Sequence, residues 1–175
     1  LLDSVRGYEK YLVSNATNGD GTGVSNNNSA KNDDGFQTNN SGVTNQNGQP
    51  YVAWNWKAGG EPTADNSASA GATPTSGSVK IDGSNKSDAL AGTIAVTRLS
   101  ANTTAGFSII THTGTGSAGT LAHGLTSAPE MIWFKQRNTT NDWMVYNKTV
   151  GNNRFLYLNL TNSQTGTSSS YFNNT

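Results

Sequence analysis

The sequence predicts an all-β protein, built from sandwich- or barrel-like antiparallel β units with long polar loops. Three observations carry this prediction. Gly, Ser, Thr and Asn make up about half of the 175 residues, and these residue types favour extended chain and turns over helix. Short apolar runs alternate with clusters of turn residues along the chain. Two similar segments lie far apart, which indicates that the chain is part of a tandem repeat array.

The composition excludes several classes of protein. The hydrophobic fraction is 33%, below the roughly 45–50% of ordinary domains. The net charge is zero, whereas disordered chains usually combine low hydrophobicity with high net charge. Lys and Arg are scattered, so we expect no nucleic-acid partner. No apolar run is long enough for membrane insertion, and the absence of cysteine excludes disulfides and thiolate chemistry.

The two similar segments are residues 7–18 and 151–162. Both read Gly-x-x-basic-aromatic-Leu-x-x-Asn-x-Thr-Asn, at a constant offset of 144 residues. Low complexity explains the Asn and Thr matches more easily than the basic, aromatic and Leu positions in the same register. We therefore expect one full period followed by the truncated start of the next. A tandem array of β units suits a fibre.

The predicted first lobe spans residues 1–60. It contains a long polar stretch, residues 19–49, in which Phe36 is the only aromatic residue and is expected to pin the loop to the body. Residues 51–57 alternate strictly and predict a strand that buries Val52, Trp54 and Trp56 on one face.

An Ala/Ser/Gly/Pro-rich linker or edge segment is expected at 61–90, and a second β lobe at 91–175. Within that lobe, residues 92–99 and 106–113 predict paired strands. Residues 131–135 are apolar on both faces, which favours a central or interface strand. Two further strands are expected at 142–146 and 154–160.

Motifs for chemistry are weak. Residues 114–119 match G-x-G-x-x-G, but the sequence leaves little room for the helix that dinucleotide binding requires. Residues 18–23 resemble the start of a calcium loop, yet its closing carboxylate would fall at Ser29, so a turn is favoured. Asp33 and Asp34 are acidic neighbours to which the same argument applies.

His112 and His123 are the only histidines, and neither has a Cys or an evident carboxylate spacing around it. The acidic residues show no marked pair of the kind that glycoside hydrolysis needs. We expect no enzyme, no catalytic, cofactor-binding or metal-binding residue, and no cofactor.

The aromatic residues outside the predicted core are candidates for contacts. Trp133 lies in the run that is apolar on both faces. Trp143 alternates with Val145 and is the least constrained tryptophan, and Tyr146 follows on the same strand. We therefore name Trp133, Trp143 and Tyr146 as candidate glycan or subunit contacts.

Three blocks of sequence resemble the repetitive tail-fibre and virion-surface structural proteins of marine tailed bacteriophages. The blocks comprise residues 34–36, 47–48 and 51–60; residues 100–110 and 113–116; and residues 123–125, 128–132 and 143–148. In such proteins the blocks recur along one polypeptide, in agreement with the offset of 144. The segment 61–90 departs from the family pattern, because it is longer than the usual spacer.

The resemblance implies a virion structural protein, a tail-fibre or surface-fibre segment with a role in host attachment. It implies self-association as a homotrimer, contact with other virion proteins, and a location on the virion surface. A host-surface glycan is a further expected partner. The alternative is a carbohydrate-binding, lectin-like module of a secreted or cell-surface protein. A fibre should bury both faces of residues 131–134, whereas a lectin-like module should expose an aromatic platform.

Overall fold

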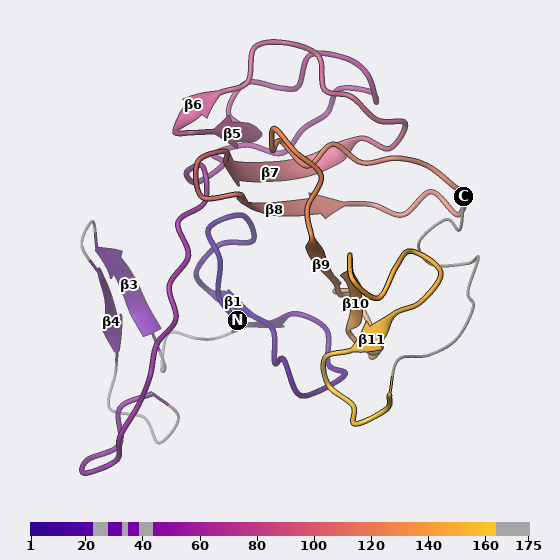
Figure 1. The fold of residues 1–175 in the computed structure, drawn as a ribbon. Helices are drawn as coiled ribbons and strands as arrows, with labels where there is room; N and C mark the ends of the chain where they lie inside the picture. Colours follow the sequence, from indigo (N-terminus) through magenta and orange to yellow (C-terminus); the bar gives the residue numbers. More distant parts are fainter. Residues whose placement is uncertain (23–27, 33–34, 39–43, 164–175) are drawn as a thin grey trace. The chain divides into compact units, whose positions relative to one another are not determined.

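The computed structural model describes residues 1–22, 28–32, 35–38 and 44–163, and Figure 1 shows its fold. The expected all-β class is confirmed, because the described residues contain no helix and about 26% of the chain is strand. The strands form small sheets of two to four members. All pairs are antiparallel except β5 with β7, which run parallel.

The chain divides into two compact units, each assembled from segments that are distant in sequence. Unit 1 contains Leu1–Leu2, Glu9–Ser25 and Ala128–Thr175, and unit 2 contains Asp3–Tyr8 and Asn26–Ser127. The expected lobe boundaries after residues 60 and 90 therefore both fall inside unit 2. Changes in composition along the chain do not mark the boundaries of these units, because each unit combines segments that are far apart in the sequence.

Unit 2 is built on a four-stranded sheet with the strand order β6-β5-β7-β8. Its strands are β5 (Val79–Ile81), β6 (Ser84–Asn85), β7 (Val96–Asn102) and β8 (Phe107–His112). The expected antiparallel pairing of the last two strands is confirmed, with Leu99 opposite Ile110 and a register shift near residues 96–98. β7 is central, and its side chains are buried in the pattern expected for a strand covered on both faces.

The core of unit 2 is small and consists of Val79, Val96, Leu99 and Ala101. Five partly buried apolar side chains pack against it: Ile81, Leu90, Ile110, Leu121 and Leu125. Ser78 and Ser100 are fully buried beside them. Small residues therefore allow close packing where the sequence lacks the volume of an ordinary apolar core.

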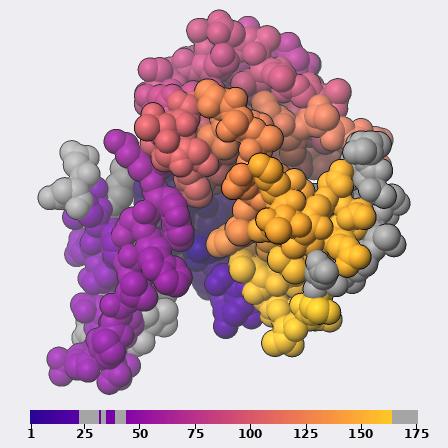
Figure 2. All heavy atoms as spheres, in the orientation of Figure 1, coloured from indigo at the N-terminus to yellow at the C-terminus, as the bar shows by residue number. Residues whose placement is uncertain are grey.

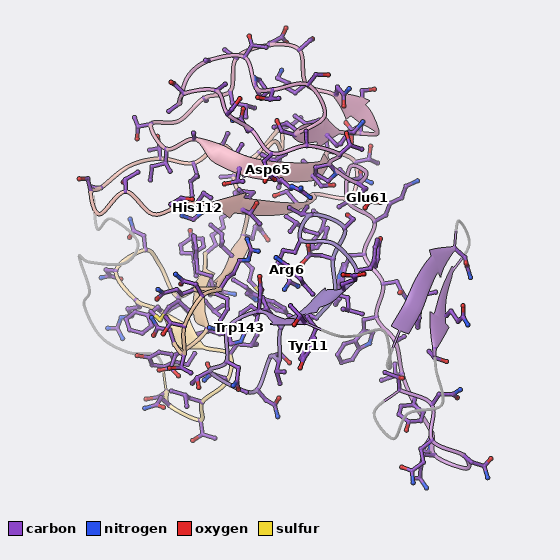
Figure 3. The ribbon with its side chains drawn as sticks, turned by 180° about the vertical axis from the view of Figure 1, so that it is seen from behind. Arg6, Tyr11, Glu61, Asp65, His112 and Trp143 are labelled. Carbon is purple, nitrogen blue, oxygen red and sulfur yellow. The ribbon has the colours of Figure 1, made fainter. Side chains whose placement is uncertain are left out.

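The segment 61–90, expected to be a linker or an edge segment, is part of the sheet of unit 2 and contributes its edge strand β6. It contributes β5 and the fully buried Val79 to the centre of unit 2. Asn66 ties the preceding loop to β7: its Nδ2 donates to the Val96 carbonyl at 3.0 Å, and its backbone N–H donates to that of Thr97 at 2.9 Å. Asp65 forms an ion pair with Arg98 (Figure 3). Hydrogen bonds, which leave little trace in composition, order this polar segment.

The polar stretch of the first lobe contains a hairpin. β3 (Asn28–Asn32) pairs antiparallel with β4 (Gly35–Thr38) across a bulge. Phe36 lies on β4 and is 44% exposed, so it does not pin the stretch by burial, as had been expected. The Asp33–Asp34 pair lies outside the described residues.

Unit 1 combines a short hairpin with a three-stranded sheet. The hairpin pairs β1 (Lys10–Tyr11) with β2 (Gly21–Thr22). The sheet has the order β11-β10-β9, formed by β9 (Met131–Phe134), β10 (Met144–Asn147) and β11 (Leu156–Tyr157). β9 is therefore at the end of this sheet and not central.

The two similar segments share a backbone feature but not a strand register. Gly7 and Gly151 have φ angles of 92° and 93°, a region in which glycine carries no steric cost. Beyond these glycines the segments differ, because β1 and β11 occupy positions two residues apart within the shared motif. The tandem array stays a prediction.

Candidate functional site

The most exposed large apolar side chains among the described residues lie in the segment 51–57 of unit 2, drawn in purple at the surface in Figure 2. It runs extended between the β3–β4 hairpin and the four-stranded sheet (Figure 1) and contains no strand pairing. Val52, Trp54 and Trp56 are 75%, 76% and 56% exposed. The expectation that these three residues form core is therefore wrong. Their alternation correctly predicts extended chain, but no neighbouring strand or layer covers it.

Two glycines anchor the C-terminal end of this segment to the sheet. The Gly59 carbonyl accepts a hydrogen bond from the Gly83 N–H at 2.8 Å, and the Gly60 carbonyl accepts one from the Ser100 hydroxyl at 2.6 Å. Gly59 is buried against β7, where an added Cβ would meet the Ala101 carbonyl oxygen. The close approach explains why glycine is required where the segment reaches the sheet.

Trp56 gives the segment a second anchor. Its ring stacks on Phe107, the first residue of β8, with centroids 6.1 Å apart and an interplanar angle of 19°. This is an offset-stacked geometry of the favourable kind. Trp54 has no such ring partner among the described residues and leaves most of its surface in solvent.

The two faces of the segment differ in chemistry. Val52, Trp54 and Trp56 alternate on one face, while Tyr51, Ala53, Asn55 and Lys57 alternate on the other. Asn55 Nδ2 donates to the Ala53 carbonyl at 3.5 Å, within the segment, and no strand of the described residues pairs with residues 52–57. The peptide groups of these residues are thus available to pair with another strand.

β9 presents a second, smaller apolar surface, in unit 1. Met131 and Trp133 are 51% and 43% exposed and point to the same face of the sheet. Trp133 lies opposite the buried Val145 of β10. Tyr146 pairs with Ile132, so its half-buried side chain lies on the face of the sheet opposite Trp133, and the two candidate contacts do not share one surface.

Trp143 does not belong to that surface. It is 4% exposed, its Nε1–H donates to the Val13 carbonyl at 3.0 Å, and its backbone N–H donates to Asn159 Oδ1 at 2.9 Å. These contacts lie inside unit 1, where Trp143 is part of the core with Phe155 (Figure 3). Trp143 is thus among the most constrained tryptophans, and the expected contact role is corrected.

Asp20 and His123, which are of residue types that can bind metal ions, form contacts with nearby groups of the chain. Asp20 forms an ion pair with Arg137 at 2.7 Å, and its backbone N–H donates to the Arg137 carbonyl. His123 Nδ1 accepts a hydrogen bond from the Leu125 N–H at 3.1 Å. Within the described ranges, no cluster of three His, Cys, Asp or Glu side chains could hold a metal ion. The same residues include no helix able to cross a membrane.

Three side chains have shifted pKa values. Hydrogen bonds from the side chain and backbone of Thr103 lower the pKa of Asp82. Burial lowers the pKa of His112. Burial also lowers the pKa of Lys135, against the opposing effect of nearby carboxylates. Each shift has a local structural cause, and the three groups do not form a cluster.

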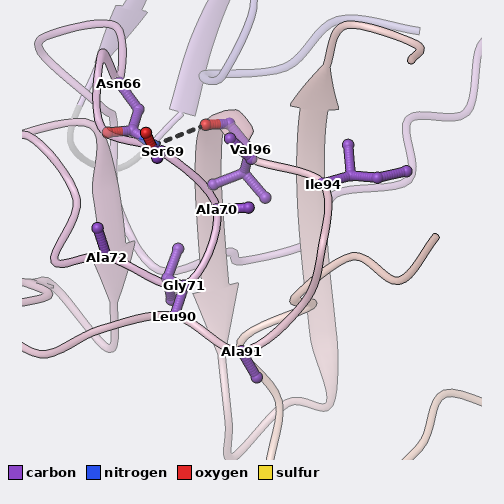
Figure 4. A pocket seen from close by; sticks show the side chains of 10 residues that line it. Asn66, Ser69, Ala70, Gly71, Ala72, Leu90, Ala91, Ile94 and Val96 are labelled. Atoms are coloured by element: carbon purple, nitrogen blue, oxygen red, sulfur yellow. Dashed lines mark hydrogen bonds between the residues drawn. The ribbon is translucent and has the colours of Figure 1, made fainter.

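A shallow pocket lies in unit 2 between the 66–72 loop and the 90–96 segment (Figure 4). Its volume is about 10 Å³, room for roughly one water molecule and far below the roughly 300–1,000 Å³ of usual small-molecule sites. Alanine, glycine, leucine, isoleucine and valine dominate its lining, with Asn66 and Ser69 as the polar members. Asn66 is already bonded to Val96, so the pocket offers few groups that could orient a ligand.

The exposed strand was missed in the sequence because alternation predicts an apolar face but not what covers it. The Gly59–Gly60 pair marks the anchor in the sequence. The sequence signal for exposure is the number of other strands in the chain that could pair with residues 51–57.

Comparison with known proteins adds a family but no activity. No curated protein and no solved structure matches the chain. A family model described as a domain of unknown function, DUF7483, matches residues 1–175. Because that match covers the whole chain, the protein belongs to the DUF7483 family.

Proposed function

We propose that the chain is a non-enzymatic structural segment of a tail fibre or surface fibre on a phage virion, with a role in host attachment. The observation that supports it best is the exposed face of Val52, Trp54 and Trp56. Contiguous apolar patches of this kind usually mark an interaction site. The phage assignment itself rests on the sequence resemblance described above.

In this proposal the chain works by association rather than chemistry. Copies assemble as a homotrimer and contact other virion proteins, and many weak contacts with a host-surface glycan add up through avidity. The zero net charge means that copies do not repel one another strongly. The small core of unit 2 also suits a chain that gains stability from its neighbours.

The first experiment is multi-angle light scattering of the 175-residue chain over a hundredfold range of concentration. The proposal expects a closed oligomer, with three times the 18.3 kDa chain mass as the specific result. A monomer at every concentration would rule out self-association of this chain, and with it the fibre proposal.

A lectin-like module is the second candidate, and the half-exposed Trp133 on β9 favours it. A ring at a sheet edge can stack on a sugar, as aromatic residues of binding sites do. Titration of monomeric protein with an array of glycans, followed by tryptophan fluorescence, tests this candidate. A response that disappears in Trp133→Ala and remains in Trp54→Ala would favour the lectin-like function over the fibre.

A further inference from the structure

We infer that the face formed by Val52, Trp54 and Trp56 is the surface through which copies of this chain associate, packed against the same face of its neighbours around a rotational symmetry axis. The inference rests on the proposed self-association and names the residues responsible for it. Trp133, the subunit contact expected from the sequence, is then not the main contact.

The area of this face suits a weak contact that repetition strengthens. Val52, Trp54 and Trp56 are each more than half exposed. Since an aromatic side chain presents roughly 150–250 Å² when fully exposed, these three side chains contribute on the order of 400 Å² per copy. Two such faces together bury roughly 800 Å², the size of a weak or transient interface, and many copies in parallel would add up through avidity.

The chemistry of the face favours a second copy over a sugar. A sugar site combines a ring platform with several polar groups that orient hydroxyls. This face instead consists of Val52 and two tryptophan side chains, and it has no carboxylate, amide or guanidinium group. The polar members of the segment, Asn55 and Lys57, are on the opposite face. A dry, aromatic face of this composition matches the centre of a protein interface.

The charge distribution of the segment and its anchoring to the sheet both suit this face to packing against an identical face. Lys57 is the one charged residue of the segment 51–57 and points away from the apolar face, so two copies meet without like charges opposed. The Trp56 stack on Phe107 and the Gly59 anchor hold the C-terminal end of the strand on the sheet. The strand therefore loses less conformational freedom on association than a free peptide would.

Packing against the same face also explains why an unpaired strand is stable in extended form. In an antiparallel ribbon of two such strands, the apolar side chains of both would stay on one uncovered side. When the faces meet across an axis, those side chains are buried, and the backbone groups on the outside remain hydrated or pair with neighbours.

Site-directed cross-linking tests the inference, because the natural chain has no cysteine that would compete. Faces that pack side chain to side chain lie about 10 Å apart, so a bis-maleimide of similar reach is used. Val52→Cys is expected to give a covalent dimer at least tenfold faster than Ala53→Cys, its exposed neighbour on the opposite face. Equal rates for the two variants would overturn the inference.

Light scattering of two further variants provides the matched measurement. Trp54→Ala is expected to raise the concentration at which half of the oligomer dissociates at least tenfold, while Asn55→Ala leaves it within twofold. Both side chains are exposed, so an unchanged circular dichroism spectrum and melting temperature of the dissociated chain serve as the folding control.

The outcomes separate this inference from the proposed function. An oligomer that forms normally with Trp54→Ala, or that cross-links through Trp133→Cys but not Val52→Cys, keeps self-association and overturns the assigned face. A natural chain that is monomeric throughout overturns both. A monomer in which Trp54→Ala abolishes glycan binding would assign the face to a sugar.

Discussion

The indole N–H of Trp143 donates to the Val13 carbonyl oxygen at 3.0 Å, across 130 positions of sequence. This bond joins the N-terminal segment of unit 1 to the residue just before β10. The ring is almost fully buried, so the bond is shielded from water. A single side chain thus supplies both packing volume and a partner for a peptide group, which matters in a unit with few large residues.

Trp143→Phe is expected to destabilise unit 1. It removes the donor to Val13 and leaves a cavity, which together should lower the free energy of unfolding by about 1–3 kcal/mol. Trp133→Phe, on the exposed edge of β9, should change it by less than about 0.5 kcal/mol. Urea unfolding of both variants at one low protein concentration measures the difference. Equal effects would contradict the interior role of Trp143.

Gly59→Ala is expected to disturb the anchor of the exposed strand. An ideal Cβ at this position would lie 2.0 Å from the Ala101 carbonyl oxygen and 2.7 Å from that of Lys80, and both are backbone atoms that cannot rotate away. We expect a loss of about 1–3 kcal/mol in unfolding free energy. Gly114→Ala is the control, because its Cβ meets nothing within 4 Å. A neutral Gly59→Ala would show that the segment is not held against the sheet.

Asn66→Asp is expected to loosen the loop that Asn66 ties to β7. The carboxylate cannot donate to the Val96 carbonyl and would place a negative charge beside that oxygen. The loss should be about 1–3 kcal/mol at neutral pH. Asn47→Asp, at an exposed turn position, serves as the matched control. Hydrogen exchange of the residue 66 amide, which donates to the Thr97 carbonyl beside the lost bond, should accelerate in Asn66→Asp only.

Asp82 gives unit 2 a predictable dependence on pH. The pKa of Asp82 lies below its ordinary value of 3.8 because the Thr103 hydroxyl and N–H donate to its carboxylate. The unfolded chain therefore takes up this proton at a higher pH than the folded chain does. The stabilising contribution is complete above pH 3.8 and is lost as pH falls through the lower, folded-state pKa.

Asp82→Asn tests that dependence without disturbing the backbone. Asp82 has a φ of 50°, a conformation that Asn tolerates well. The natural chain should exceed the variant in urea midpoint at pH 5, and the gap should narrow below pH 3.8 because Asn does not titrate. A gap of constant size from pH 6 to pH 2.5 would show that the Asp82 charge contributes nothing.

The strand-rich half of the chain was more predictable than the polar half. The β7–β8 pair and strands near 131–134, 144–147 and 156–157 follow from apolar runs between turn residues, and their ends differ by a few residues from those expected. The ordered structure of residues 61–90 could not be predicted from the sequence. It depends on hydrogen bonds of Asn66 and on the parallel pairing of β5 with β7. The spacing of apolar residues predicts neither the Asn66 hydrogen bonds nor the parallel pairing of β5.

Trp54 and Trp143 illustrate the same limit. Both are tryptophans in alternating segments, and the sequence predicted the first to be buried and the second to be a surface contact. The structure reverses the two, with 76% exposure for Trp54 and 4% for Trp143. Alternation predicts which side chains share a face. It does not predict which face is covered, because the covering residues come from elsewhere in the chain.

The β class and the positions of strands β7 to β11 follow from local residue preferences, which act over a few neighbouring positions. The absence of disulfides follows from the absence of cysteine. The division into two discontinuous units, the parallel β5–β7 pair and the exposed face of residues 52–56 depend on contacts between distant segments. Those contacts decide which apolar surface remains exposed, since burial is a property of the packed chain and not of the residue.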